Sequence, residues 1–259
     1  MKNITLISDW KLRDPYVGMF KGELFTLFTD INIIDITHSI QPSHIPQTAF
    51  ILKNCYTSFP KGSLHIILTG FSLSKSSLPV ITQYDEHWFL GEDTGIFSLL
   101  FENEYKNLKA WQYPEKNSKS INAKIMEMAE WCFEQTLEKK AILYPNDKFI
   151  HKTTFKPSYS QTHDTLTGEV ICIDSVANAI TNIPVDFFHE VRKNRNFTLK
   201  IDSRKELISS TYYESYQENA DSVYLIPNRL GYIEISFYPA NIAAMAAIYV
   251  GNHVKITFQ

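Results

Sequence analysis

Several features that mark other classes of protein are missing from this chain of 259 residues. It has three cysteines, Cys55, Cys132 and Cys172, and no two of them form a CxxC pair. This spacing argues against a zinc knuckle and a disulfide framework, and it favours a reducing compartment. No stretch approaches the roughly 18 apolar residues of a membrane span, and the apolar run before Asp9 is too short for a signal-peptide core of roughly 7–15 residues. We therefore expect a cytoplasmic protein without a membrane partner.

The chain also lacks an excess of basic charge and the common catalytic motifs. It has 25 basic and 28 acidic residues, a formal net charge of −3, whereas a nucleic-acid binder needs a clustered basic surface to neutralise phosphates. It contains no GxGxxG, P-loop, HExxH or GxSxG motif, and its histidines match no metal-binding spacing. We expect a small molecule or another protein as partner, and neither nucleic acid nor metal.

What is present is the composition of an ordinary globular protein, with 44% hydrophobic and 20% charged residues. In the first half, short β-branched runs alternate with stretches of helical periodicity. Strands are expected at residues 3–8, 32–37, 64–68, 80–82 and 88–91, and helices at 14–28, 45–59 and 121–139. This alternation predicts an α/β domain with a largely parallel sheet, in which ligands bind beyond the carboxyl ends of the strands.

The second half has a different pattern. Short strand-like runs separated by turns occur at residues 168–173, 197–201, 222–226, 231–236 and 253–258, which is typical of a small all-β barrel or sandwich. Between the two halves the chain is rich in Pro, Thr, Ser, Lys and His and has no periodicity, as expected of a linker. We predict an α/β domain over residues 1–155, a linker over 156–164 and a β-barrel domain over 165–259.

Polar residues next to predicted strands are the first candidates for a site. Asp9 and Asp14 follow the first strand, where two carboxylates can accept hydrogen bonds from a ribose diol or hold a cation. The alternative makes Asp14 the N-cap of a helix that starts at Pro15, and Asp9 a turn residue. Residues 91–95 form another acidic turn, and such turns are common without any function. Asn178 either contacts an adenine edge or caps a turn, and composition does not separate the two.

Several motifs occur together in a characteristic order. They lie at residues 7–10 with 14–22, then 34–40, 59–65, 91–95, 174–183 and 231–235. The more specific are Asp-Xaa-Tyr-Val-Gly at 14–18, Asp-Ile-Thr-His at 35–38 and Thr-Asn-Ile at 181–183. Over nearly the whole chain this series resembles the S-adenosylmethionine (SAM) hydroxide adenosyltransferases, which are relatives of the SAM-dependent fluorinase and chlorinase.

The resemblance implies an N-terminal α/β domain, a C-terminal β-barrel and a homotrimer. SAM, as substrate or ligand rather than cofactor, would lie between the N-domain of one subunit and the C-domain of the next. By motif position, Asp9 would bind the ribose hydroxyls and Asp14 would support its loop, with Thr94 at the place of an Asn of the family. Trp10 and Lys11 stand where the family has Phe-Gly.

The resemblance also assigns roles in the second domain. Asp174 would bind the methionine ammonium and Asn178 the adenine edge, while Asn228 and Arg229 would bind the methionine carboxylate. These assignments agree with simple chemistry, because an ammonium favours a carboxylate partner and a carboxylate favours the fork of an arginine.

The catalytic residues depart from the family pattern. The hydrolases of the family carry an Asp-Pro-Gly-Val-Gly loop, an Arg soon after it and a later His, which together orient the attacking water. Here Gly70 stands at the place of the Asp and Ser77 near that of the Arg, and residues 88–150 contain neither His nor Arg. Replacement candidates are polar residues near these positions: Ser72, Ser74, Lys75 and Asp93.

Two functions follow from the resemblance. The first is a SAM hydrolase with altered catalytic residues, which gives adenosine and methionine by substitution at the ribose C5′. The alternative is a catalytically inactive SAM- or adenosine-binding protein of the same fold. A scaffold with a decayed pocket is a third reading, and the retained Asp9, Asp174, Asn178 and Arg229 argue against it.

Overall fold

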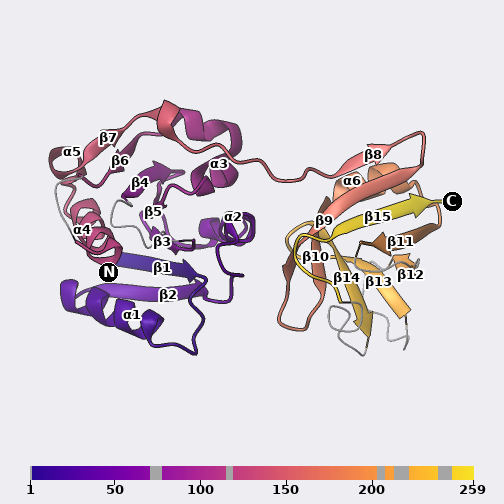
Figure 1. Cartoon of the computed structure of the whole chain (residues 1–259), viewed down its shortest axis with the longest axis horizontal. Coiled ribbons are helices and arrows are strands. Elements are labelled where there is room, and N and C mark those ends of the chain that lie inside the picture. The colour runs from indigo at the N-terminus through magenta and orange to yellow at the C-terminus, as the bar shows by residue number, and fades with distance from the viewer. Residues whose placement is uncertain (1, 71–77, 115–118, 203–207, 213–221, 239–246) are drawn as a thin grey trace. The chain divides into compact units, whose positions relative to one another are not determined.

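The computed structural model describes residues 2–70, 78–114, 119–202, 208–212, 222–238 and 247–259. The chain forms two compact units, residues 1–153 and 154–259 (Figure 1). No helix among the described residues is long and apolar enough to cross a lipid bilayer.

The first unit is built on a sheet with the strand order β2-β1-β3-β5-β4-β6-β7. Its strands are β1 (Lys2–Ser8), β2 (Ile31–Thr37), β3 (Leu64–Leu68), β4 (Pro79–Tyr84), β5 (His87–Glu92), β6 (Ala110–Gln112) and β7 (Ile142–Tyr144). The neighbouring pairs among β2, β1, β3 and β5 are parallel, whereas β4, β6 and β7 pair antiparallel. The predicted parallel core is confirmed, and the sheet is mixed beyond β5.

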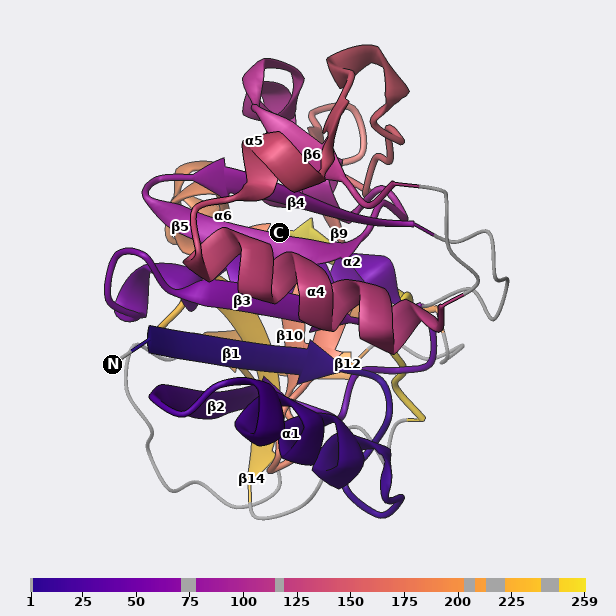
Figure 2. The same ribbon diagram turned by 90° about the vertical axis from the view of Figure 1, so that its left-hand side faces the viewer.

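Helices cover both faces of this sheet. They are α1 (Tyr16–Leu27), α2 (Ile45–Lys53), α3 (Ile96–Phe101), α4 (Ile121–Phe133) and α5 (Leu137–Lys140), with 3₁₀ turns η1 (Tyr56–Ser58), η2 (Glu102–Asn107) and η3 (Asn146–Lys148). Figure 2 shows α1 and α4 in front of the sheet and α2 behind it. Side chains of α1 and α4 share one apolar core with β1 and β3, and those of α2 and α3 share a second core on the other face.

Three details of the predicted helices are wrong. The helix predicted over 45–59 ends at Lys53 and is followed by the separate turn η1. Asp14 is not an N-cap, because α1 begins at Tyr16 with Pro15 in the cap position and without a side-chain hydrogen bond at the cap. The stretch 121–139 is not one helix. It begins as predicted, with the Ser120 hydroxyl accepting from the N–H of Ala123 at 3.3 Å, but Gln135 adopts a positive φ of 58°. A residue in the left-handed region ends an α-helix, so the chain restarts as α5.

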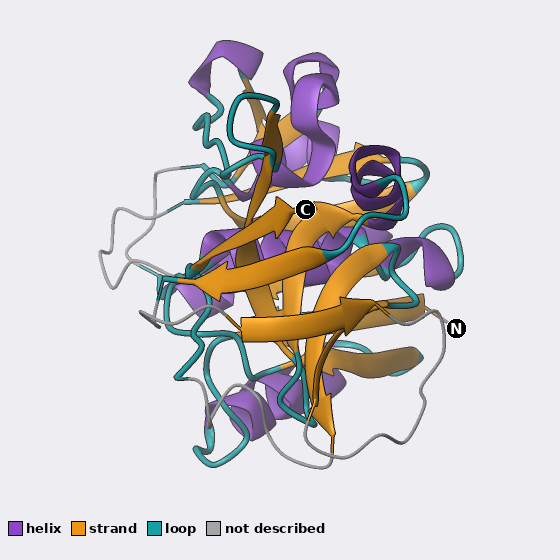
Figure 3. Cartoon of the chain, turned by 90° about the vertical axis from the view of Figure 1, so that its right-hand side faces the viewer, coloured by secondary structure: helices purple, strands orange, loops and turns teal. Residues whose placement is uncertain are grey.

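The second unit is an all-β fold closed on itself (Figure 3). Its elements are β8 (Ser158–Ser160), β9 (Thr165–Ile173), β10 (Ala179–Pro184), α6 (Val185–Arg192), β11 (Phe197–Ile201), β12 (Ile208–Tyr212), β13 (Ser222–Pro227), β14 (Tyr232–Tyr238) and β15 (His253–Phe258). The strand order is β10-β14-β13-β12-β11-β15-β9-β8, and β9 also pairs with β10, which completes a ring. Among the described strands the pairs are antiparallel except β12–β13.

This ring confirms the predicted barrel, but the predicted linker holds a strand. Residues 158–160 form β8, which pairs with the first half of β9, so they are part of the second unit. The helix α6 was also missed. Its Phe188 and Val191 are buried in the barrel core with residues such as Leu166 and Ile233, and a run of eight residues shows too few turns for a clear helical period.

A buried pair of histidines lies on the first sheet. Nδ1 of His65 is 2.7 Å from Oγ1 of Thr5, and Nε2 of His65 is 3.2 Å from Nδ1 of His87. His65 has no exposed surface. Burial, together with the charge of His87, lowers the pKa of His65 to about 3. The neutral form of this imidazole is therefore the form that the native fold accepts.

This pair predicts a loss of stability in mild acid. In the unfolded chain the pKa of His65 is about 6.5, so between that value and about 3 only the unfolded state takes up the proton. The resulting loss approaches about 1.4 kcal/mol per pH unit. The variant His65→Gln lacks this proton, so the difference in unfolding free energy between wild type and variant should shrink from pH 6 to pH 4. Urea denaturation measures it, and a difference independent of pH would contradict the prediction.

Candidate functional site

The carboxyl ends of β1, β2, β3 and β5 lie at one edge of the first sheet, because these strands are parallel. From β1 the chain first passes to β2 on one side and then to β3 on the other side of β1. The direction of winding therefore reverses between β1 and β3. In open α/β sheets ligands bind outside the strand ends at such a switch point. Asp9 directly follows β1 and Gly70 lies just after β3, so this edge is the candidate site of the first unit.

Asp9 is held at this edge by two backbone N–H groups. Its Oδ2 accepts from Ser43 at 2.8 Å and from Gly70 at 3.2 Å. These bonds join the end of β1 to the segment before α2 and to the end of β3. Within the described part of the chain, Oδ1 of Asp9 accepts no hydrogen bond, so it is the oxygen that can accept one from a ligand.

Gly70 has a structural reason to be glycine. Its φ is +68°, and a Cβ atom there would lie 2.9 Å from Cδ1 of Ile45. Glycine adopts a positive φ without steric cost. The backbone can therefore pass close to the start of α2 and direct its N–H to Asp9.

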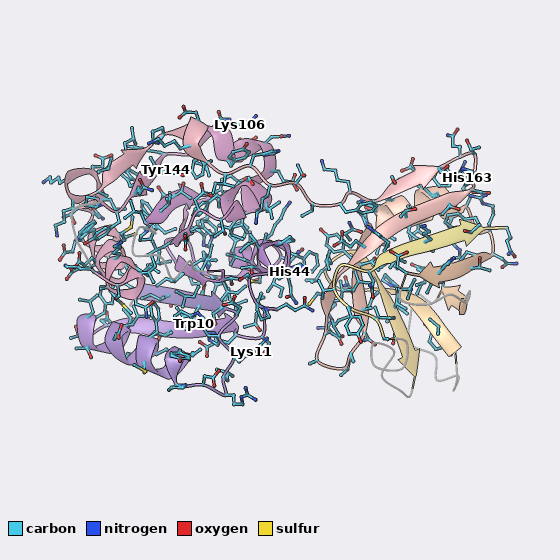
Figure 4. All side chains as sticks on the ribbon, viewed as in Figure 1. Trp10, Lys11, His44, Lys106, Tyr144 and His163 are labelled. Atoms are coloured by element: carbon cyan, nitrogen blue, oxygen red, sulfur yellow. The ribbon has the colours of Figure 1, made fainter. Side chains whose placement is uncertain are left out.

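Trp10 and Lys11 complete the loop after β1 (Figure 4). Lys11 has a φ of 65°, a conformation that suits the glycine of the family pattern and costs a lysine of the order of 1 kcal/mol. Its N–H donates to the carbonyl of His38 at 2.9 Å and its Nζ to that of Ile40 at 2.7 Å. The Trp10 ring packs edge-on against Phe20, with centroids 5.7 Å apart.

Asp14 and Thr94 lie near the same edge. Asp14 is half-buried in the loop that leads to α1. The N–H of Thr94 donates to the carbonyl of Glu92 at 2.9 Å, so Thr94 lies just after β5. Since β5 is two strands from β1, strand spacing alone places Thr94 about 10 Å from Asp9.

Asp93 has a structural role in this fold. Its Oδ1 accepts from the N–H of Gly95 at 3.1 Å, and its Oδ2 accepts from the hydroxyl of Tyr144 at 3.0 Å and the N–H of Ile150 at 2.9 Å. Burial raises the pKa of Asp93, although these hydrogen bonds act in the opposite direction. Oδ2 thus holds Tyr144 and the segment around residue 150 on the turn after β5, whereas Oδ1 stabilises the turn itself. The other catalytic candidates, Ser72, Ser74 and Lys75, lie outside the described residues.

In the second unit, Asp174 and Asn178 occupy the β9–β10 turn. Oδ1 of Asp174 accepts from the N–H groups of Val176 at 2.9 Å and Asn178 at 2.8 Å. The side-chain amide of Asn178 donates to Oδ2 of Asp174 at 3.1 Å and to Oε1 of Glu234 at 2.7 Å. The amide thus bridges two carboxylates, which leaves its oxygen as the atom that can face a ligand.

Glu234 is the functional candidate that the sequence reasoning missed. It lies on β14 between Ile233 and Ile235, whose side chains enter the barrel core, so its own side chain points away from that core. It is nevertheless only 8% exposed. Burial, together with the charge of Asp174, raises the pKa of Glu234. The sequence offered only a weak signal, a glutamate between two apolar residues of a predicted strand, because its burial is not visible there.

Asn228 and Arg229 lie in the β13–β14 turn. Oδ1 of Asn228 accepts from the N–H groups of Leu230 and Tyr232, each at 3.0 Å. Its buried Nδ2 lowers the pKa of Glu234 but makes no well-aligned hydrogen bond within the described residues. Arg229 is exposed. Among the residues that the structure describes, Arg229 has no ion pair, and no group of three or more His, Cys, Asp or Glu could hold a metal ion.

Two family models match the chain. The SAM hydroxide adenosyltransferase N-terminal domain matches residues 4–133, and the C-terminal domain of the same family matches residues 168–255. The chain therefore belongs to the SAM hydroxide adenosyltransferase family, which confirms the resemblance found in the motifs. The two matched segments fall in the first and the second unit respectively.

Individual relatives agree with this family. A protein named (R)-S-adenosyl-L-methionine hydrolase from Methanocaldococcus jannaschii is 24% identical over 267 residues, which cover 98% of this chain and 95% of that protein. A protein of the same name from Thermus thermophilus is 24% identical over 101 residues, 38% of each chain.

Solved structures show the same fold. An uncharacterised conserved protein from Thermotoga maritima has a TM-score of 0.80 at 18% identity, covering 98% of this chain and 99% of its own. A conserved hypothetical protein from Thermus thermophilus has a TM-score of 0.72 at 16% identity, covering 99% of this chain and 100% of its own.

The bonds of Asp93 predict a loss of stability on its removal. In Asp93→Ala two backbone N–H groups and the hydroxyl of Tyr144 lose a buried acceptor, which should cost about 3 kcal/mol of unfolding free energy. The exposed Asp147 provides a matched control, since Asp147→Ala should cost less than about 0.5 kcal/mol. Urea denaturation measures both. Wild-type stability in Asp93→Ala together with lost turnover would instead make Asp93 a catalytic residue.

The surroundings of Glu234 predict a gain in thermal stability when its charge is removed. Because its pKa is raised in the folded protein, the ionised carboxylate costs stability at neutral pH. Glu234→Gln retains an oxygen for Asn178 and removes the charge, so its Tm at pH 7 should exceed that of the wild type by a few degrees. The gain should disappear on acidification, as the wild-type side chain takes up its proton. A lower Tm at pH 7 in thermal denaturation would contradict this reading.

Proposed function

We propose that this chain binds SAM and hydrolyses it to adenosine and methionine. Water attacks the ribose C5′, and the new C5′–O bond forms as the C5′–S bond breaks. Methionine leaves with the electron pair of that bond, and the attacking water releases one proton to the solvent. The observation that carries the proposal is Asp9, whose Oδ2 is fixed by two N–H groups at the switch point of the sheet, while its Oδ1 accepts no hydrogen bond from the described residues.

The proposed contacts follow from the charges of the ligand. Oδ1 of Asp9 would accept from the ribose diol, and a charged acceptor makes the stronger kind of hydrogen bond. The methionine ammonium would be attracted by Asp174 and by Glu234, two carboxylates joined through one amide. The methionine carboxylate would pair with Arg229 and accept from Asn228.

Three further assignments complete the proposed site. The adenine edge would meet the free side-chain oxygen of Asn178. Asp14 would support the Asp9 loop, and Thr94 would line the edge after β5. We also propose a homotrimer, in which each site combines the first unit of one subunit with the second unit of the next. A monomer in sedimentation that binds SAM at full affinity would contradict that arrangement.

A second candidate is a SAM- or adenosine-binding protein without turnover. It is favoured by Gly70, which supplies no carboxylate at the place where the resemblance puts a catalytic aspartate and whose φ of +68° would strain any other residue. It is also favoured by Asp93, since both of its oxygens have structural hydrogen bonds. Hydrolysis remains the first proposal because positioning and removal of water from the nucleophile can supply most of the rate, and a sulfonium is a good leaving group.

One experiment separates these functions. The purified protein is incubated with SAM in plain buffer and in chloride, and adenosine, 5′-chloroadenosine and methionine are separated by chromatography. Calorimetry measures SAM binding in parallel. Adenosine that depends on the protein supports the hydrolase, and a chlorinated product would move the protein to the halogenases. Binding without a product supports the second candidate. The absence of both would overturn the proposed ligand.

The proposed role of Asp9 predicts a loss of affinity for adenosine when its free oxygen is replaced. In Asp9→Asn the amide oxygen can keep both backbone hydrogen bonds, while an NH₂ group replaces the uncommitted oxygen. The affinity for adenosine should fall about tenfold or more, as expected for a hydrogen bond to a charged acceptor, with little change in Tm. Asp85→Asn, an exposed residue in the turn between β4 and β5, is the matched control. Equal affinities of Asp9→Asn and wild type in calorimetry would overturn the assignment.

A further inference from the structure

A buried series of polar side chains lies next to the Asp9 loop. Oγ of Ser8 is 2.6 Å from Nδ1 of His38, and Nε2 of His38 is 3.1 Å from Oδ1 of Asp35. The other oxygen of Asp35 accepts from Nζ of Lys21 at 2.6 Å. Ser8 has no exposed surface and His38 is 3% exposed, so the series runs from the protein surface at Lys21 to the interior beside Asp9.

The charges fix the direction of these interactions. Burial acts to raise the pKa of Asp35, but the hydrogen bonds and charges of Lys21 and His38 outweigh it and lower the value, so Asp35 is a carboxylate at neutral pH. Nε2 of His38 makes no well-aligned hydrogen bond within the described residues, and its interaction with Asp35 is mainly electrostatic. A carboxylate beside Nε2 favours the proton on that nitrogen. Nδ1 then accepts from the hydroxyl of Ser8.

Ser8 is not placed as a nucleophile, although it forms a series with a histidine and an aspartate. An attacking hydroxyl must reach the substrate, and the Ser8 side chain has no accessible surface. Its Oγ also accepts from the N–H of Trp10 at 3.3 Å. The hydroxyl therefore joins the ring of His38 to the backbone of the loop.

His38 holds this loop in two ways. Its ring acts through Ser8, the residue before Asp9, and its carbonyl accepts from the N–H of Lys11 at 2.9 Å. Asp9 lies between these two attachments. A displacement of about 1 Å at a binding group is enough to weaken a well-oriented contact strongly.

We propose that His38 is a positioning residue for recognition of the ribose diol. Through Ser8 and the backbone of the loop it sets the place of Oδ1 of Asp9, and Asp35 supports it by keeping the proton on Nε2. This inference rests on the proposed function, because it takes Asp9 as the acceptor for the diol. It adds a residue that is buried away from the ligand and acts through others.

The test compares two ligands in a pair of matched variants. His38→Leu removes the acceptor for Ser8, whereas His38→Asn places an amide group where Nδ1 stands and can retain that contact. Calorimetry gives the affinities for adenosine and for 2′,3′-dideoxyadenosine, which lacks both hydroxyls. The ratio of the two affinities reports diol recognition alone, and a merely structural effect would weaken both ligands together.

In the wild type we expect adenosine to bind about tenfold or more tightly than the dideoxynucleoside. In His38→Leu the ratio should fall to about twofold or less, mainly through adenosine, and His38→Asn should restore most of it. Asp35→Asn, which leaves the ring in place, should lower the ratio at least about threefold. The control His163→Leu changes an exposed histidine of the second unit and should keep the wild-type ratio.

The outcomes separate the two proposals. A wild type that binds neither ligand, or binds both equally, contradicts the proposed function. A wild type that discriminates, with an unchanged ratio in a folded His38→Leu, overturns the role of His38. Thermal denaturation establishes folding. If His38→Leu does not fold, an unchanged ratio in Asp35→Asn overturns the inference, and a reduced ratio supports it.

Discussion

One oxygen of Asp9 organises the candidate site of the first unit. Oδ2 accepts from residues that are 34 and 61 positions away in the sequence, so a single carboxylate joins the ends of two strands to the segment before α2. That segment is also held by His44, whose side chain accepts from the N–H of Gln47 at 3.0 Å and caps α2. The loops at this edge therefore depend on each other, and they leave the second oxygen of Asp9 in a fixed position.

The first unit orients a single carboxylate, whereas the second unit holds two carboxylates close together. Asp174 and Glu234 are close enough for the charge of one to raise the pKa of the other, and the amide of Asn178 satisfies only part of both carboxylates. Like charges in a buried position destabilise a fold unless a counter-charge is supplied. A cationic ligand group would supply it, which is why perturbed carboxylates of this kind occur at functional sites. The acidic cluster of the barrel thus suits a cationic group, whereas the oriented carboxylate of Asp9 suits hydroxyl donors.

The sequence predicted best the strands with a clear apolar pattern. β1 and β3 are nearly continuous apolar or β-branched runs and β15 alternates, and all three were found within a residue of their ends. β6, β7 and β8 have three residues each, which is too short for any period. β6 and β7 form through pairing with strands distant in the sequence, and β8 pairs with the adjacent β9. Asp9 became a candidate because ligands bind beyond the strand ends of a parallel sheet. Glu234 was missed because its burial depends on Asn178, 56 positions away, and no local pattern reveals such a contact.

Gly70 shows how the fold of a family can persist while its catalytic groups change. The resemblance places an aspartate of the hydrolases at this position, but here the φ of +68° disfavours any side chain, and a Cβ would require the tip of Ile45 to shift. The N–H of Gly70 also donates to Oδ2 of Asp9, so this glycine helps to set the position of the Asp9 carboxylate. An aspartate at position 70 would carry backbone strain of the order of 1 kcal/mol and would require the Ile45 side chain to adjust. The departure at Gly70 therefore involves the backbone geometry around Asp9 as well as the absence of one carboxylate.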